Sequence, residues 1–180
     1  YRGVDNPVDI SVAGYSAKDI QPSMSNGSLS KAAQGFIVKP GKDPKATIGV
    51  TVTNPDGSKK SLPGLEFRVK NVPDPKPYFG GKSLADQTIK KTELTAAAGV
   101  LAKMVDFEFD LKFEVIEYTV SANLSGNFVS ETVKGAGVNG TVSQMFGKIK
   151  TGQKVFIENI KARGPDGSLR PIGTLSLKVI

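Results

Sequence analysis

The chain has 180 residues, with 24 Lys and Arg against 17 Asp and Glu, and it contains neither Cys nor His. The lack of these two residue types excludes disulfide bonds, thiol nucleophiles, imidazole general bases and the usual zinc sites. The lysines that make up the net charge of +7 are scattered along the sequence, which predicts a solvated surface and no nucleic-acid interface.

We expect a fragment of a longer chain, because Tyr1 comes first and no stretch resembles a signal peptide or a membrane span. A length of 180 residues suits two domains of immunoglobulin-like (Ig-like) size. We therefore predict a mainly β protein of two tandem Ig-like β-sandwich domains, residues 1–79 and 80–180, the second with one or two short helices.

The first half predicts short antiparallel strands. Apolar residues alternate at Val8, Ile10 and Val12, as in a strand with one buried face. The sequence Asn-Pro-Asp-Gly at 54–57 predicts a hairpin turn, because Gly fits its left-handed position. Further strands are expected near Ile20 and Leu29 and over 36–38, 46–53 and 65–72, where Leu65, Phe67 and Val69 should face inward.

A proline-rich stretch separates the two halves. Pro73, Pro75 and Pro77 hold the backbone extended and remove hydrogen-bond donors, which argues against a central strand. Gly80 and Gly81 follow. We predict a linker over about 73–81, with a semi-rigid proline spacer and a hinge at the two glycines.

The segment 105–120 alternates apolar and charged residues and is predicted to form the spine strand of the second domain. The alternation changes phase at Val115 and Ile116, which predicts a β-bulge there. Its polar positions include the acidic residues Asp106, Glu108, Asp110 and Glu114.

Four acidic residues on one strand could bind a hard cation, or act as acid and base on a glycosidic bond. Lys112 interrupts the row, however, and no Asp-rich loop accompanies it. Alternating charge is also normal on a half-exposed strand. We therefore interpret Asp106, Glu108, Asp110 and Glu114 as candidate protein-contact residues, with no catalytic, cofactor-binding or metal site.

Two short helices are expected in the second half. Thr92 is a candidate cap for a helix over 93–98 that Gly99 ends. The second helix begins near Thr141, ends before Gly152, and places four apolar residues on one face. These residues are Val142, Met145, Phe146 and Ile149.

Residues 135–140 read Gly-Ala-Gly-Val-Asn-Gly, which imitates the dinucleotide-binding fingerprint, with Glu158 as the distant acid. The preceding strand, however, contains Ser130 and Glu131, whereas a buried parallel strand would be continuously apolar. No β-α-β series surrounds the glycines. We therefore predict a flexible loop and no cofactor.

An internal echo supports two related domains. Pro-Asp-Gly-Ser occurs at 55–58 and again at 165–168, and the apolar residues that follow also correspond. Leu65 and Phe67 match Leu175 and Leu177. Each half is therefore predicted to close with the same kind of hairpin.

Four segments together resemble the C-terminal periplasmic half of the GldM/PorM family. They are YRGVDNPV at 1–8, FRVKNVPDP at 67–75, DFEFDLKF at 106–113, and the stretch from Gly152 through IENIKA to Gly164-Pro165-Asp166-Gly167. The resemblance is spread over most of the chain and implies two β-rich Ig-like modules.

The same resemblance implies a homodimeric component of the type IX secretion and gliding machinery, with no catalytic residues and no cofactor. Family members carry an N-terminal transmembrane helix, absent here, that pairs with GldL/PorL in the inner membrane. Their periplasmic arm reaches the ring formed by GldK/PorK and GldN/PorN and passes on motion. These properties imply a periplasmic location for this segment, with an inner-membrane anchor in the full-length protein.

Two other functions stay open. A secreted carbohydrate-binding or adhesive Ig-like module would need an exposed aromatic platform, and the chain has no Trp and four Tyr. A hydrolase would have to use Asp106 or Glu108. No small-molecule substrate is expected.

Overall fold

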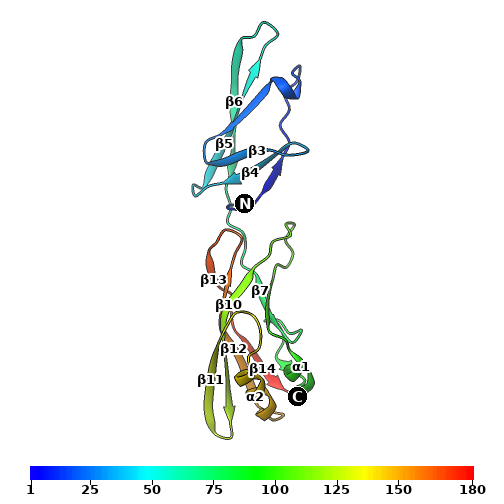
Figure 1. Ribbon diagram of the computed structural model, residues 1–180, viewed down its shortest axis with the longest axis vertical. Helices are drawn as coiled ribbons and strands as arrows, with labels where there is room; N and C mark the ends of the chain where they lie inside the picture. Colours follow the sequence, from blue (N-terminus) through cyan, green and yellow to red (C-terminus); the bar gives the residue numbers. More distant parts are fainter. The chain divides into compact units, whose positions relative to one another are not determined.

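The computed structural model describes all residues, 1–180, and is built mostly of antiparallel strands with a few short helices (Figure 1). This confirms the mainly β class. The chain divides into two compact units in tandem, unit 1 (Tyr1–Val72) and unit 2 (Pro73–Ile180). No helix is long and apolar enough to cross a lipid bilayer.

Unit 1 consists of two three-stranded antiparallel sheets, with strand orders β1-β4-β3 and β2-β5-β6. A short 3-10 helix, η1 (Ala17–Asp19), precedes β2. The buried side chains include Val38 of one sheet and Ala46, Ile48 and Val52 of the other. The strands are β1 (Asn6–Val8), β2 (Ile20–Met24), β3 (Gly27–Lys31), β4 (Phe36–Pro40), β5 (Lys45–Thr53) and β6 (Lys59–Arg68).

The β5–β6 hairpin forms at the predicted turn. Gly57 has φ +84°, and its N–H donates to the Asn54 carbonyl at 2.9 Å. The inward-facing apolar side chains expected after the turn are not buried, because Leu65 and Phe67 are exposed. Their strand, β6, lies at the edge of its sheet and has no neighbour beyond it.

Unit 2 has a larger sheet of order β11-β10-β12-β14-β8, with β13 beside β12, and a separate β7-β9 pair. Phe79 of β7 meets Phe146 of α2 edge to face, at 5.6 Å between ring centroids, and both rings are buried. The elements are β7 (Lys76–Phe79), β8 (Thr88–Ile89), α1 (Lys91–Ala96), β9 (Val100–Lys103), β10 (Glu114–Leu124), β11 (Asn127–Lys134), α2 (Gly140–Lys148), β12 (Lys154–Arg163), β13 (Leu169–Pro171) and β14 (Leu175–Val179).

Both predicted helices are present, with different caps. In α2, Asn139 replaces Thr141 as the N-cap, since its side chain accepts from the Val142 N–H at 2.8 Å. In α1, the backbone N–H of Lys90 donates to Glu93 at 3.0 Å, so Thr92 is not the cap. The predicted apolar face of α2 is confirmed, because Val142, Met145, Phe146 and Ile149 are all buried.

The predicted spine strand is wrong in its first half. Residues 104–113 form no strand, and β10 begins only at Glu114 and runs to Leu124. Asp106 has φ +55°, and the Leu111 N–H donates to the Phe109 carbonyl at 3.0 Å, so the backbone turns twice. The predicted bulge is confirmed, because the β10–β12 register shifts between Val115 and Glu117.

The boundary between the units also differs from the expected 79/80. Residues 76–79 form β7, which pairs with β9 inside unit 2, so the chain passes between the units at Val72 and Pro73. Proline is tolerated in β7 because this strand has only one neighbour. Gly80 and Gly81 form a tight turn closed by two hydrogen bonds of 2.9 Å between Phe79 and Lys82.

The repeated Pro-Asp-Gly-Ser sequence adopts the same local structure in both units. In each Pro-Asp-Gly-Ser turn the Asp carboxylate accepts from the Ser N–H, at 2.9 Å from Ser58 to Asp56 and at 3.1 Å from Ser168 to Asp166. The strand before each turn has an antiparallel neighbour on one side, β2 for β5 and β10 for β12. The β2-β5-β6 sheet of unit 1 and the central part of the larger sheet of unit 2 are therefore built alike.

Candidate functional site

The four acidic candidates do not line one strand face. Asp106, Glu108 and Asp110 lie in the loop 104–113, whereas Glu114 begins β10 and pairs with Arg163 at 3.6 Å, both side chains being exposed. No three acidic side chains come close enough to hold a metal ion. Their role as protein-contact residues stays a prediction.

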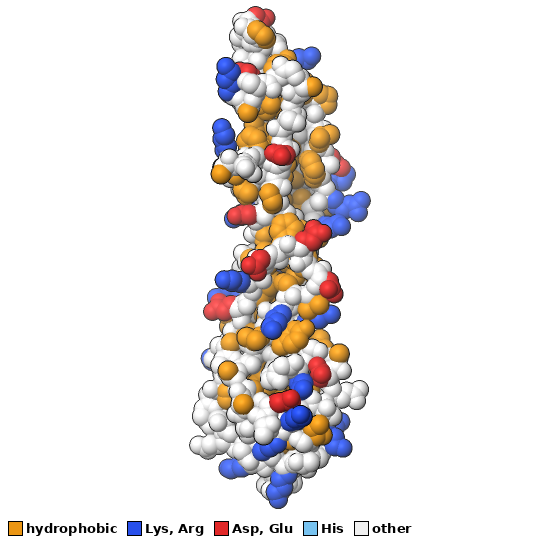
Figure 2. Space-filling view, turned by 90° about the vertical axis from the view of Figure 1, so that its right-hand side faces the viewer, with side chains coloured by type: hydrophobic (Ala, Val, Ile, Leu, Met, Phe, Trp, Pro, Cys, Tyr) orange, Lys and Arg blue, Asp and Glu red, His pale blue; other side chains and the backbone are white.

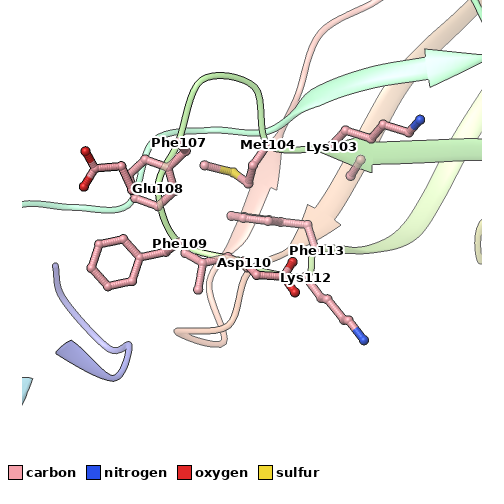
Figure 3. Close-up of a pocket in the computed structure, with 10 residues that line it drawn as sticks. Lys103, Met104, Phe107, Glu108, Phe109, Asp110, Lys112 and Phe113 are labelled. Carbon is pink, nitrogen blue, oxygen red and sulfur yellow. The ribbon is translucent and has the colours of Figure 1, made fainter. Parts of the chain in front are cut away.

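The loop 104–113 forms the wall of an open pocket of about 630 Å³ (Figure 3). Phe107 and Phe109 lie side by side, with their ring centroids 5.5 Å apart. The carboxylate of Glu108 and the ammonium group of Lys112 point outward in different directions. This arrangement gives a charged rim around aromatic side chains.

Arg170 binds the first residues of unit 2, where the chain arrives from unit 1. One nitrogen of its guanidinium donates to the Asp74 carboxylate at 3.1 Å and to the Pro73 carbonyl at 3.5 Å. The other terminal nitrogen donates to Asp166 at 2.6 Å, and Nε donates to Ser168 at 2.8 Å. The side chain of Arg170 is only 13% exposed. We call Asp74, Asp166, Ser168 and Arg170 the entry cluster.

Aromatic packing and electrostatics support the entry cluster. Arg170 lies over the ring of Phe113, at 5.5 Å from its centroid, a favourable cation–π distance. Burial of the Asp166 carboxylate opposes its ionisation, but hydrogen bonds from Ser168 and Arg170 outweigh this effect and hold its pKa below the ordinary value of 3.8. The cluster therefore fixes the first two residues of unit 2 to the β12–β13 turn.

The predicted linker residues have different environments. Pro73 is exposed and its carbonyl accepts from Arg170, whereas Pro75 and Pro77 are buried. Gly80 and Gly81 both have positive φ, +54° and +78°, in the turn after β7. A hinge between the units is therefore not located at the glycines, and only Pro73 lies at the junction.

The glycine-rich loop 135–140 forms backbone hydrogen bonds with the segment 98–100. The Val100 N–H donates to the Ala136 carbonyl at 2.8 Å, and the Val138 N–H donates to the Ala98 carbonyl at 3.0 Å. A Cβ atom on Gly99 would lie 2.0 Å from the Ala136 carbonyl oxygen. The glycines therefore allow two backbones to approach closely, and the loop is paired with 98–100 where a freely flexible loop was expected.

A second charged cluster, which the sequence did not reveal, joins three strands. Glu117 of β10 pairs with Lys134 of β11 and with Lys161 of β12, the latter at 2.7 Å. Hydrogen bonds from these two lysines hold the pKa of Glu117 at about 2, well below its ordinary value of 4.5. The cluster is on the surface and ties adjacent strands together.

On the face of the molecule in Figure 2, Lys and Arg side chains lie among Asp and Glu side chains, with hydrophobic side chains between them. A nucleic-acid interface would instead require a basic stripe with interleaved aromatic rings.

Comparison with family models accounts for nearly the whole chain. Residues 1–70 match the GldM third domain, and residues 73–179 match the GldM C-terminal domain. A comparison with curated individual proteins gives no match. The two matched ranges meet at the junction between the compact units, at Val72 and Pro73. The chain therefore belongs to the GldM family and carries its third and C-terminal domains.

Proposed function

We propose that this chain is a non-enzymatic periplasmic segment that transmits displacement from an inner-membrane motor to the GldK/GldN (PorK/PorN) ring. Membership of the GldM family makes the protein a component of the gliding and type IX secretion machinery. In the proposal, the protein acts as a homodimer, and a GldL/PorL-type partner contacts a part of it that lies outside these residues.

The entry cluster is the observation that carries the mechanical part of the proposal. A segment that transmits displacement loses motion wherever a flexible linker intervenes. Here Arg170 joins Pro73 and Asp74 to the β12–β13 turn, so force on the chain at residue 73 reaches the sheet of unit 2 directly. Pro73 also restricts its own φ and the conformation of Val72.

The loop 104–113 is the proposed contact with the ring. Glu108 and Asp110 are exposed and alternate along the chain with the aromatic residues Phe107 and Phe109. Charged rims around aromatic residues are a common arrangement at protein interfaces, where the charges set orientation and association rate.

Co-purification tests the contact. The double variant Glu108→Lys with Asp110→Lys, in the full-length protein, should recover less of the ring proteins than wild type. The matched control is Asp5→Lys with Asp43→Lys, which makes the same change of charge at two exposed positions of unit 1. Unchanged recovery with the loop variant would remove the loop from the interface, and loss with both would show a non-specific charge effect.

A further inference from the structure

Unit 1 contains an apolar groove of about 530 Å³ along its edge. Strand β6 forms one wall, and the segment 8–13 forms the other. The side chains in the groove are mostly aliphatic or aromatic. They include Val8, Ile10, Val12, Ile48, Val50, Leu62, Leu65 and Phe67.

The groove leaves core-type side chains uncovered. Leu65 is 68% exposed and Phe67 is 45% exposed, although each pairs across the sheet with a buried residue, Ile48 and Ala46 respectively. A smaller cavity of about 120 Å³ continues inward past Phe67 and Ile48. The interior of unit 1 is therefore incomplete on this side.

Both walls of the groove also have unpaired backbone. Strand β6 pairs only with β5, so its outer edge is free. Between Asp9 and Ala13, the single backbone hydrogen bond is the one that the Val12 carbonyl accepts from the Tyr15 N–H, at 3.1 Å. Unpaired strand edges bind extended segments.

The corresponding leucines of unit 2 are covered, unlike Leu65 and Phe67 of unit 1. Leu175 and Leu177, which match Leu65 and Phe67 in the internal echo, are 1% and 0% exposed. Their strand, β14, has the short strand β8 on its outer side, which runs parallel to it and pairs with Lys178 and Val179, just beyond the two leucines. Unit 1 has no strand in the place of β8. By analogy with β8, an extended strand that runs parallel to β6 and continues past Leu65 and Phe67 would cover the groove.

The charges beside the groove indicate the chemistry of its occupant. Lys59 and Lys60 begin β6, Arg68 ends it, and none of the three forms an ion pair. Asp9 is the one acidic residue in the groove lining. A second copy pairing antiparallel along β6 would place Lys59 and Lys60 opposite Arg68, which like-charge repulsion disfavours.

We propose that this groove binds an extended segment of a partner protein, apolar at alternate positions and acidic at both ends, as a strand parallel to β6. The backbone edge supplies hydrogen bonds, the groove takes alternate apolar side chains, and the cations at the ends of β6 fix the register. The site is distinct from the loop 104–113 and does not depend on the ring contact.

The test uses the 180-residue chain and the capped peptide Asp-Asp-Val-Thr-Val-Thr-Val-Asp-Asp, with Lys-Lys-Val-Thr-Val-Thr-Val-Lys-Lys as its control. The acidic peptide should shift the amide NMR signals of 9–13 and 59–68 and bind at least about tenfold more tightly than the basic one. A spin label at its N-terminus should broaden signals near Lys60, and a label at its C-terminus should broaden those near Arg68. The reverse pattern would contradict the parallel arrangement.

Substitutions distinguish binding in the groove from non-specific binding to the protein surface. Leu65→Ser should weaken binding of the acidic peptide, and Lys59→Glu with Lys60→Glu should reverse the preference between the two peptides. Leu169→Ser, which alters an exposed leucine of unit 2, should change nothing. Equal affinity for both peptides, no binding at about 1 mM, or signal shifts elsewhere would overturn the proposal.

Two further outcomes assign the groove to another occupant. If the free chain is a dimer that Leu65→Ser dissociates, a second copy fills the groove. If the peptide binds the 180-residue chain but not a form with extra residues before Tyr1, a covalently attached segment fills it. Either result overturns the partner-protein proposal.

Discussion

Arg170 is expected to be the most sensitive polar residue of unit 2. Its guanidinium makes hydrogen bonds to four groups while only 13% of the side chain is exposed. Truncation removes these bonds and the contact with the Phe113 ring, and it leaves the Asp166 carboxylate, 16% exposed, without its cation. Arg170→Ala should lower the free energy of unfolding of unit 2 by about 2–3 kcal/mol. Urea unfolding followed by the NMR signals of unit 2 measures this change.

The control is Arg163→Ala, which removes an exposed pair with Glu114 at 3.6 Å and should cost less than about 1 kcal/mol. Equal costs for the two variants would show that the entry cluster contributes no more than a surface ion pair.

We expect the ion pairs of Glu117 to stabilise the folded protein in a way that is lost in acid. Its pKa is about 2 in the folded protein against 4.5 ordinarily, so its pairing with Lys134 and Lys161 stabilises the fold fully above pH 4.5. The stabilisation is lost as the pH falls through about 2. The melting temperature of wild type should therefore exceed that of Glu117→Gln at neutral pH, and the two should converge under strongly acidic conditions.

Thermal unfolding of the two proteins across this pH range makes the comparison. A constant difference in melting temperature at every pH would mean that the Glu117 charge is not responsible.

At the scale of elements, two glycines give opposite predictions. A Cβ atom on Gly99 would lie 2.0 Å from the Ala136 carbonyl oxygen, whereas one on Gly147 of α2 would meet nothing within 4 Å. Gly99→Ala should therefore destabilise unit 2 by about 2 kcal/mol or more, because two backbones must separate. Gly147→Ala should stabilise it by about 0.5–1 kcal/mol through helix propensity.

Urea unfolding of both variants tests this pair. A Gly99→Ala variant as stable as wild type would show that the pairing of 98–100 with the glycine-rich loop is easily displaced.

Sequence periodicity predicted elements well where a neighbouring strand exists and failed where none does. The alternation over 46–53 and the helical spacing from Val142 to Ile149 both match the structure. The alternation over 105–113 is equally regular, but this segment forms no strand. Periodicity reports which side chains can share a face, and it carries no information about pairing partners.

The candidate site shows the same limit. The acidic residues were found because they lie close together in sequence, and the structure separates Glu114 from the other three. Arg170 was missed because its partners Asp74 and Pro73 lie nearly a hundred positions away. No local pattern marks a contact of that separation.

At the scale of the whole molecule, the sequence predicted two related β-rich units in tandem but placed their junction several residues late. Prolines 75 and 77 suggested a linker, yet both are buried in unit 2, where β7 pairs on one side only. Replacing all three prolines would therefore damage unit 2. The test of the junction must be confined to Pro73 and Asp74.

Gliding speed in cells that carry Pro73→Gly with Asp74→Gly in the full-length protein tests the central claim most directly. This variant removes the Asp74 carboxylate that Arg170 holds, while the backbone carbonyl of residue 73 stays as an acceptor. It also removes the φ restriction of Pro73 and leaves the core of unit 2 intact. We predict slower gliding and reduced secretion at unchanged protein level and ring co-purification, with Arg163→Ala as the unaffected control. Wild-type speed with this loosened junction would contradict the proposal that the entry cluster transmits displacement.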